Sequence, residues 1–256
     1  MKKLFVLCFL LAFISGIQAQ QKVSLEDVAK GTYRAENIYG IKPMLDGNYY
    51  TQISADKKRI VKYSFKTGKE VATVFDVNTA RECNFKEFDD YIMSPDEKLI
   101  LIQTETKPIY RRSFTAVYYI YNVQNNKLEP LSNNGPQQAP LFSPDGFQIA
   151  FVRNNNIYLV KLLFGNSESQ VTKDGEFNKV LNGIPDWVYE EEFGFNRAFE
   201  FSADSKMIAY IRFDESKVPM YSFPWYKGLA PEKKEYATYP GEYLSLIHIS
   251  EPTRPY

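Results

Sequence analysis

Three consecutive glutamates are the residues in this sequence most suggestive of chemistry. Glu190, Glu191 and Glu192 follow Asp186 and two aromatic residues in the order Asp-Trp-Val-Tyr-Glu-Glu-Glu. Adjacent carboxylates repel one another, and binding a cation relieves that repulsion, whether the cation is a metal ion, an arginine or the ammonium group of a ligand. The simpler interpretation is a solvated face, because charged residues are easily accommodated at a surface. The rest of the sequence has to decide between the two.

The sequence contains no recognisable catalytic motif. Gly-x-Ser-x-Gly does not occur, and the single histidine, His248, lies in a C-terminal segment unlike the rest of the chain. A Ser-His-Asp triad therefore cannot be assembled from the remaining residues. The carboxylate clusters lack the order of a calcium-binding loop, and carboxylate pairs suited to glycoside hydrolysis are too common to be specific. We expect no catalytic residue, no metal ion and no cofactor in this chain.

The two ends of the chain are set apart from its middle. Residues 1–19 have a positive start, an apolar core and a small-residue exit at Ala19, which is typical of a signal peptide for export to the periplasm or the cell exterior. Residues 244–254, Leu-Ser-Leu-Ile-His-Ile-Ser-Glu-Pro-Thr-Arg, resemble a translated sequencing adapter. We therefore expect residues 244–256 to be an artefact that truncates the reading frame, and residues 20–243 to form one domain.

A repeat runs through the middle of the chain. Four segments place Ser-Pro-Asp or Ser-Ala-Asp between two apolar stretches, and the serines are Ser54, Ser94, Ser143 and Ser202, at spacings of 40, 49 and 59 residues. The Pro/Ala-Asp pair favours a type I turn, so each unit predicts a β-hairpin. Short strands at this period favour an all-β propeller of about four blades over a β-sandwich. The glutamates interrupt this pattern.

The balance of charges argues against some classes of binding partner, and the aromatic content indicates the type of core. Lys and Arg number 31 and Asp and Glu also number 31, so nothing indicates binding to nucleic acid or to an anionic membrane surface. Aromatic residues make up 16% of the chain, which favours a sheet-rich core.

The residues around the glutamates resemble a known family. Asn-Gly-Ile-Pro-Asp-Trp-Val-Tyr-Glu-Glu-Glu-Phe, at 182–193, closely resembles the glutamate motif of the dipeptidyl peptidase IV family, serine exopeptidases of the prolyl oligopeptidase clan. Ile-Tyr-Arg-Arg-Ser-Phe-Thr-Ala, at 109–116, resembles the arginine segment of that family. Residues 142–158 and 40–51 match neighbouring blades, so the resemblance extends from the signal to about residue 242.

The resemblance implies a fold and a set of site residues. It implies an eight-bladed N-terminal propeller, of which this chain would hold about four blades, followed by an α/β-hydrolase domain that is missing here. Glu191 and Glu192 align with the glutamates that bind the free amino terminus of a peptide. Arg111 aligns with the arginine that contacts the carbonyl between the first two substrate residues. Arg112 is a less suitable contact, and Glu190 is expected to be structural or solvated.

The implied function is the release of X-Pro or X-Ala dipeptides from peptides with a free N-terminus, by a protein that is a homodimer when full length. An ammonium group offers three donors and one charge, which suits two carboxylates in a cleft. Two alternatives stay open: a prolyl tripeptidyl peptidase of the same clan, and a non-catalytic propeller that binds peptides. We expect residues 20–243 alone to be inactive and largely insoluble or molten, because an incomplete propeller leaves apolar blade faces exposed.

Overall fold

The computed structural model describes residues 23–35, 39–218, 220–226 and 234–240, and the chain divides into two units between Tyr39 and Gly40. In the first unit the described helix is α2 (Leu25–Lys30), which begins at a capping box between Ser24 and Asp27. Residues 1–19 and 244–256, on which a signal peptide and an artefact were predicted, lie outside the described residues. Within the described ranges no helix is long and apolar enough to cross a membrane.

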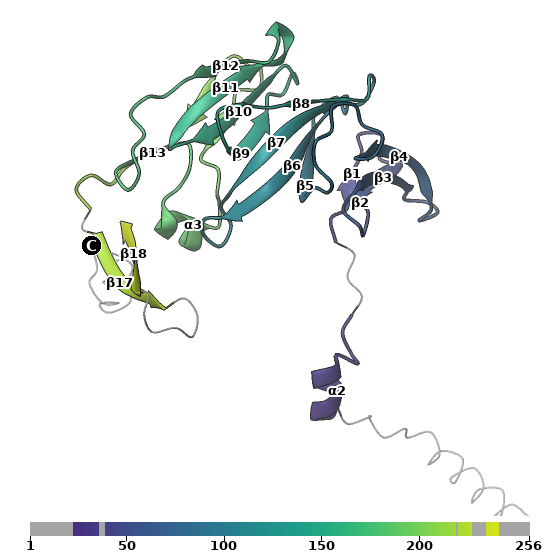
Figure 1. The fold of residues 1–256 in the computed structure, drawn as a ribbon, viewed down its shortest axis with the longest axis horizontal. Helices are drawn as coiled ribbons and strands as arrows, with labels where there is room; N and C mark the ends of the chain where they lie inside the picture. The colour runs from purple at the N-terminus through teal and green to yellow at the C-terminus, as the bar shows by residue number, and fades with distance from the viewer. Residues whose placement is uncertain (1–22, 36–38, 219, 227–233, 241–256) are drawn as a thin grey trace, which may run out of the picture. The chain divides into compact units, whose positions relative to one another are not determined.

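The second unit contains three four-stranded antiparallel sheets that follow one another in chain order (Figure 1). In each sheet, sequential strands are hydrogen-bonded neighbours. The first sheet is β1 (Lys42–Pro43), β2 (Tyr49–Ile53), β3 (Arg59–Ser64) and β4 (Glu70–Asp76). The second is β5 (Asp90–Met93), β6 (Leu99–Pro108), β7 (Phe114–Asn122) and β8 (Lys127–Pro130). The third is β9 (Gln138–Phe142), β10 (Gln148–Arg153), β11 (Asn156–Lys161) and β12 (Ser167–Gln170), with the 3-10 turn η1 (Leu162–Phe164) before β12.

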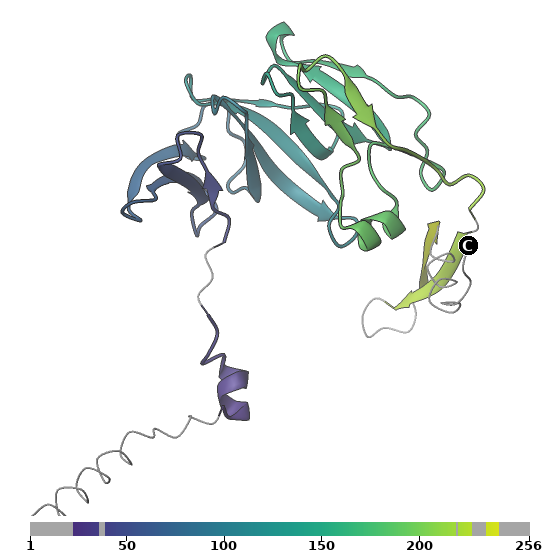
Figure 2. The same ribbon diagram turned by 180° about the vertical axis from the view of Figure 1, so that it is seen from behind.

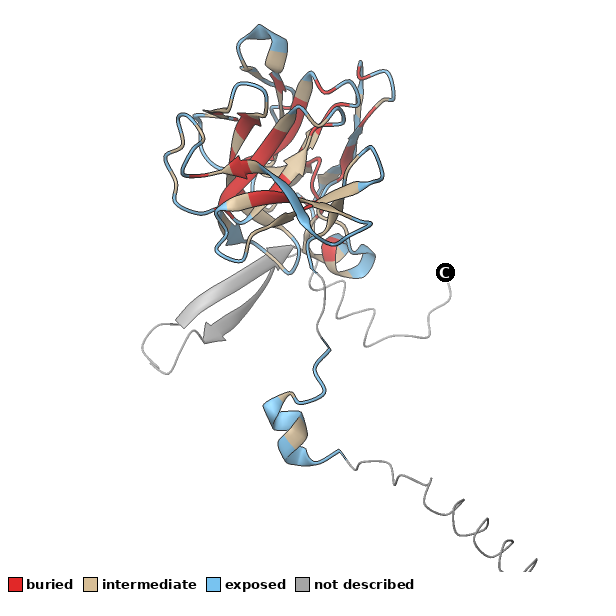
Figure 3. Cartoon of the chain, turned by 90° about the vertical axis from the view of Figure 1, so that its right-hand side faces the viewer, coloured by how far each residue is buried: buried red, intermediate tan, exposed pale blue. Residues whose placement is uncertain are grey.

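The hydrophobic core lies between successive sheets, so the second and third sheets are buried on both faces (Figure 3). In β6, Ile100 and Ile102 pack toward the first sheet, whereas Leu101 packs toward the third. In β10, Phe151 packs toward the second sheet and Val152 toward the strands that follow. Alternate side chains of a strand point to opposite faces, which explains why residues 99–102 of β6 and 149–152 of β10 are apolar without interruption. The predicted all-β architecture of stacked blades is confirmed, and closure into a ring stays a prediction.

The predicted Ser-x-Asp turns are present in all four repeats with the same hydrogen bonds. The Ser143 hydroxyl donates to Asp145 Oδ1 (2.6 Å) and accepts the backbone N–H of Gln148 (2.9 Å). The same pair of bonds recurs at Ser54, Ser94 and Ser202. The hydrogen bond from Ser143 holds the pKa of Asp145 below its usual value. Each turn joins the two apolar strands of its hairpin, as the sequence predicts: β2 and β3, β5 and β6, β9 and β10, and β14 and β15.

The fourth repeat differs from the other three. β13 (Val180–Asn182) pairs with β16 (Arg212–Asp214), and β14 (Phe199–Phe201) pairs with β15 (Ile208–Tyr210). Only Ile211 separates β15 from β16: its N–H donates to the Ala198 carbonyl (2.8 Å), and its carbonyl accepts the N–H of Gly183 (3.0 Å). The fourth blade is thus built on two short ladders, and a further hairpin, β17 (Met220–Tyr226) with β18 (Lys234–Pro240), follows it in the chain.

Residues 184–197, here called the excursion, leave one strand of this fourth blade and return to it. The Ala198 N–H donates to the Gly183 carbonyl (2.8 Å), which closes the neck of the excursion. Gly183 has φ +75°, and an added Cβ would lie 2.9 Å from Ile157 and 3.0 Å from Phe199. Glycine is therefore required here for both its conformation and its size. The excursion carries the three glutamates.

Candidate functional site

The glutamates lie on α3 (Trp187–Phe193), a short helix within the excursion. Asp186 caps its start by accepting the Tyr189 N–H (2.7 Å), and Gly194, at φ 72°, ends it. With 3.6 residues per turn, neighbouring residues on a helix lie about 100° apart, so three consecutive glutamates must point in three directions. The structure shows where each of them points.

Glu190 points inward and is 1% exposed. Its Oε1 accepts two backbone N–H groups, from Arg112 (2.6 Å) and Ser113 (2.9 Å). These residues belong to the loop 109–113 at the tip of the long β6–β7 hairpin, here called the arginine loop. The Asn196 side chain adds a third bond by donating to the Arg112 carbonyl (3.0 Å). Glu190 is therefore a structural residue that attaches α3 to the arginine loop. The sequence left open whether Glu190 is structural or solvated, and its burial shows that it is structural.

Glu191 faces the arginine loop and forms an ion pair with Arg111. The Arg111 Nε–H donates to both carboxylate oxygens, at 2.8 and 3.0 Å. The pKa of Arg111 is raised by this hydrogen bond and by the charge of Glu191. The side chains of Arg111 and Glu191 are 71% and 24% exposed, so the pair is open to solvent and to ligands. Two residues that are 80 positions apart in the chain are thus brought into contact.

The third predicted site residue, Glu192, is exposed on α3. It follows Glu191 directly on the helix, and no ion pair is found for it among the described residues. Arg112, the residue after Arg111, contributes its backbone to the Glu190 and Asn196 bonds. Arg111, Glu191 and Glu192 are called the clamp from here on.

The two segments that form the site are also the ones that lengthen the repeat. The long β6–β7 hairpin lies between the serines of the second and third repeats, and the excursion lies between those of the third and fourth. Figures 1 and 2 show α3 beside the tip of the β6–β7 hairpin in both views. The insertions that disturb the period of the sequence therefore meet in space.

One acidic residue near α3 was not identified from the sequence. Glu215 follows β16 and is 6% exposed, although its neighbours Asp214 and Ser216 are both exposed. Burial, together with a hydrogen bond to the Asp186 carboxyl and the charge of that group, raises the pKa of Glu215 to about 8. A lone glutamate in a polar stretch resembles a solvated turn, so no sequence signal pointed to it. Within the described residues, no group of three or more His, Cys, Asp and Glu is placed to hold a metal ion.

The stacked four-stranded sheets and the Arg–Glu pair on two inserted segments occur in a chain whose relatives give its class, the N-terminal β-propeller region of prolyl oligopeptidase-family peptidases. Residues 94–242 match the family described as the dipeptidyl peptidase IV (DPP IV) N-terminal region, and the chain belongs to this family.

Individual relatives agree with this assignment. The crystal structure of Porphyromonas gingivalis dipeptidyl peptidase 4 has 42% sequence identity and a TM-score of 0.77, over 86% of this chain and 31% of that chain. Prolyl endopeptidase FAP of Homo sapiens is 33% identical over 207 residues, which is 80% of this chain and 26% of the relative. Dipeptidyl peptidase 4 of Trichophyton equinum is 37% identical over 160 residues, 61% of this chain and 20% of the relative. The chain spans about a quarter of the length of the curated relatives it matches.

Proposed function

We propose that this chain is the substrate-recognition part of a serine-type dipeptidyl peptidase that releases X-Pro or X-Ala dipeptides from peptides with a free N-terminus. Glu191 and Glu192 bind the ammonium group of the substrate, and Arg111 contacts its first peptide carbonyl. The observation that carries the proposal is the ion pair between Arg111 and Glu191, in which Nε lies 2.8 and 3.0 Å from the two carboxylate oxygens.

The chemistry of the clamp suits this role. A guanidinium group has five N–H donors, and the described residues use only Nε of Arg111, which leaves the terminal amino groups for a carbonyl oxygen. The carboxylate of Glu191 is held in a fixed position by Arg111, while the exposed Glu192 supplies a second negative charge. An α-amino group titrates near roughly 7.7–8.0, so recognition should weaken at alkaline pH as the substrate loses its charge.

The remaining parts of the proposal concern the whole gene product. We propose that a separate α/β-hydrolase domain supplies the catalytic serine, aspartate and histidine, that residues 1–19 direct export, and that the full-length protein is a homodimer. Ending the substrate track at a bound amino terminus would limit cleavage to dipeptides, because nothing longer fits between the clamp and the catalytic serine.

The proposal is tested by kinetics on the protein expressed from its complete gene. We expect Glu191→Gln and Glu192→Gln each to lower kcat/KM for Gly-Pro-type chromogenic substrates by about 10²–10³-fold, the scale of losing one partner of a charge pair that the bound substrate shields from water. Glu200→Gln, an exposed glutamate on β14 (65% exposed), is the matched control and should keep wild-type activity. Wild-type kcat/KM in both clamp variants would contradict the proposal.

Two further measurements separate the alternatives. Mass spectrometry of the products distinguishes release of dipeptides from release of tripeptides. The gene sequence downstream of codon 243 shows either a Gly-x-Ser-x-Gly motif, as the peptidase requires, or a stop codon, which favours a non-catalytic peptide-binding propeller.

A further inference from the structure

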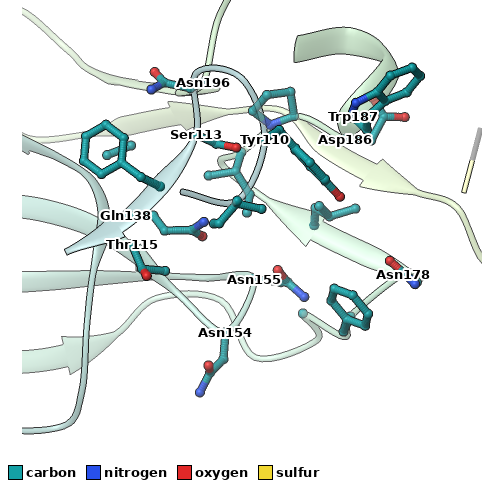
Figure 4. A pocket seen from close by; sticks show the side chains of 18 of the residues that line it. Tyr110, Ser113, Thr115, Gln138, Asn154, Asn155, Asn178, Asp186, Trp187 and Asn196 are labelled. Carbon is teal, nitrogen blue, oxygen red and sulfur yellow. The ribbon is translucent and has the colours of Figure 1, made fainter. Parts of the chain in front are cut away.

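A cavity of about 510 Å³ lies between the same two insertions that form the clamp. It is bounded by Tyr110 and Phe114 of the β6–β7 hairpin, by Trp187 of α3 and by Phe177 and Leu181 around the start of β13. Figure 4 shows Tyr110, Trp187 and Asp186 on one side and the amides of Asn154, Asn155 and Asn178 on the other. Its volume is within the range of about 300–1,000 Å³ that is typical of small-molecule sites.

The charge of this cavity is one-sided. Its lining contains two carboxyl groups, Asp186 and Glu215, and no lysine, arginine or histidine. Glu215 is held by its backbone, which donates to the Lys179 carbonyl (2.7 Å) and accepts the Val218 N–H (2.9 Å). Its Oε1 is buried and has no hydrogen-bond partner among the described residues. A buried acceptor without a donor is destabilising, and a ligand that supplies the donor would remove that cost.

We propose that this cavity is a second cation site, which binds an alkylammonium or guanidinium group of the kind carried by lysine and arginine side chains. Only the source of that group, a peptide held by the clamp, rests on the proposed function; the cation site itself stands on the cavity. Bound there, the cation donates to the carboxyl groups of Asp186 and Glu215.

The walls of the cavity fit such a ligand. Aromatic faces attract cations, and the apolar side chains contact an aliphatic stem. Tyr110, Asp186 and Glu215 are the titratable groups of the lining, whereas Lys179 and Glu176, on the adjoining loop, pair with each other outside it. A cation bound at Glu215 favours its ionised form, so binding at neutral pH should release a proton and strengthen as the pH rises toward the raised pKa of Glu215, about 8. The clamp, whose ligand loses charge in that range, should show the opposite trend.

The test uses Nα-acetyl-lysine methylamide, whose blocked amino terminus cannot occupy the clamp, and Nα-acetyl-norleucine methylamide as its uncharged counterpart. Isothermal titration calorimetry is performed on the protein expressed from its complete gene. We expect the lysine probe to bind at least tenfold more tightly than the norleucine probe, and Glu215→Gln to remove that difference. Equal affinity for the two probes would overturn the proposal.

Two variants keep the test decisive. Phe177 is 75% exposed, so Phe177→Ala can weaken binding without disturbing the core, and it decides the matter if Glu215→Gln does not fold. Unchanged lysine-probe affinity in folded Glu215→Gln or in Phe177→Ala would contradict the site. Glu191→Gln, which disables the clamp, should leave binding of the blocked probe unchanged. A loss in that variant would place the probe at the clamp and refute a separate site, whatever the peptidase assays show.

Discussion

Replacing Glu190 removes the acceptor that attaches α3 to the arginine loop. In Glu190→Ala the N–H groups of Arg112 and Ser113, now bonded at 2.6 and 2.9 Å, lose their shared partner in a buried position. In Glu190→Gln one acceptor oxygen is kept and the charge is lost, while the buried Oε2, which has no hydrogen-bond partner among the described residues, is replaced by an amide nitrogen. The two variants therefore separate the contribution of the hydrogen bonds from that of the charge.

The expected magnitudes follow from these contacts. Leaving a buried donor unsatisfied costs about 1–3 kcal/mol, so two donors, partly rescued by water, should cost about 2–4 kcal/mol in Glu190→Ala. Exchanging charge-assisted for neutral hydrogen bonds should cost about 1–2 kcal/mol in Glu190→Gln. Glu200→Gln, a surface control, should remain within about 0.5 kcal/mol of the wild type.

Amide hydrogen exchange of the arginine loop measures this cost where it arises. Because about 1.4 kcal/mol is a factor of ten, the Arg112 and Ser113 amides should exchange about 30- to 700-fold faster in Glu190→Ala, and roughly 5- to 30-fold faster in Glu190→Gln. The KM for peptides should rise in the same order, because Arg111 loses its position beside Glu191. Wild-type exchange at these two amides in Glu190→Ala would refute the structural role of Glu190.

Two other substitutions test the frame of the site. Gly183→Ala should lower the free energy of unfolding by about 2–4 kcal/mol in thermal melts, because the new Cβ clashes with Ile157 and alanine is strained at a positive φ. Gly68→Ala is the control: it has a similar φ of +66° but no neighbouring atoms to clash with, so it should cost only about 1 kcal/mol. Glu168, on β12, is paired with Arg153; burial opposes the shift, but hydrogen bonds from Arg153, Ser132 and Asn134 lower its pKa below 4.5. The contribution of Glu168 to stability is therefore complete above about pH 5 and is lost as the pH falls through its lowered pKa. Glu168→Gln should flatten the acid side of a plot of unfolding free energy against pH. An unchanged acid side would contradict this assignment.

The hairpins and their turns could be predicted because they depend on local chemistry. In each repeat the serine and aspartate satisfy the backbone of the same six-residue turn, so the signal lies within a few residues of where it acts. Arg111, Glu191 and Glu192 were identified by resemblance to a family. Contact between positions 80 residues apart depends on tertiary structure that no local pattern encodes.

The roles of the other acidic residues could not be predicted for the same reason. Composition does not show which of three adjacent helical glutamates faces the protein, and Glu190 turned out to be the buried one because the backbone of the arginine loop lies there. Glu215 lines a cavity together with residues of the arginine loop and of the stretch 175–178, which are distant from it in sequence. The sequence shows that the glutamate segment interrupts the repeat. It does not show that the strand of the fourth blade continues after residues 184–197.

The way in which the strand continues after the excursion separates the fold of the sheet from the residues of the site. Because Ile211 bonds to both Gly183 and Ala198, the strand resumes its register after the excursion as though nothing had been inserted. The length and composition of residues 184–197 can therefore change without moving any side chain of the sheet to the opposite face. The excursion could therefore be replaced by another segment without changing the register of the sheet. Transplanting the excursion together with the arginine loop, its contact in the β6–β7 hairpin, should carry the proposed preference for a peptide terminus from one propeller to another.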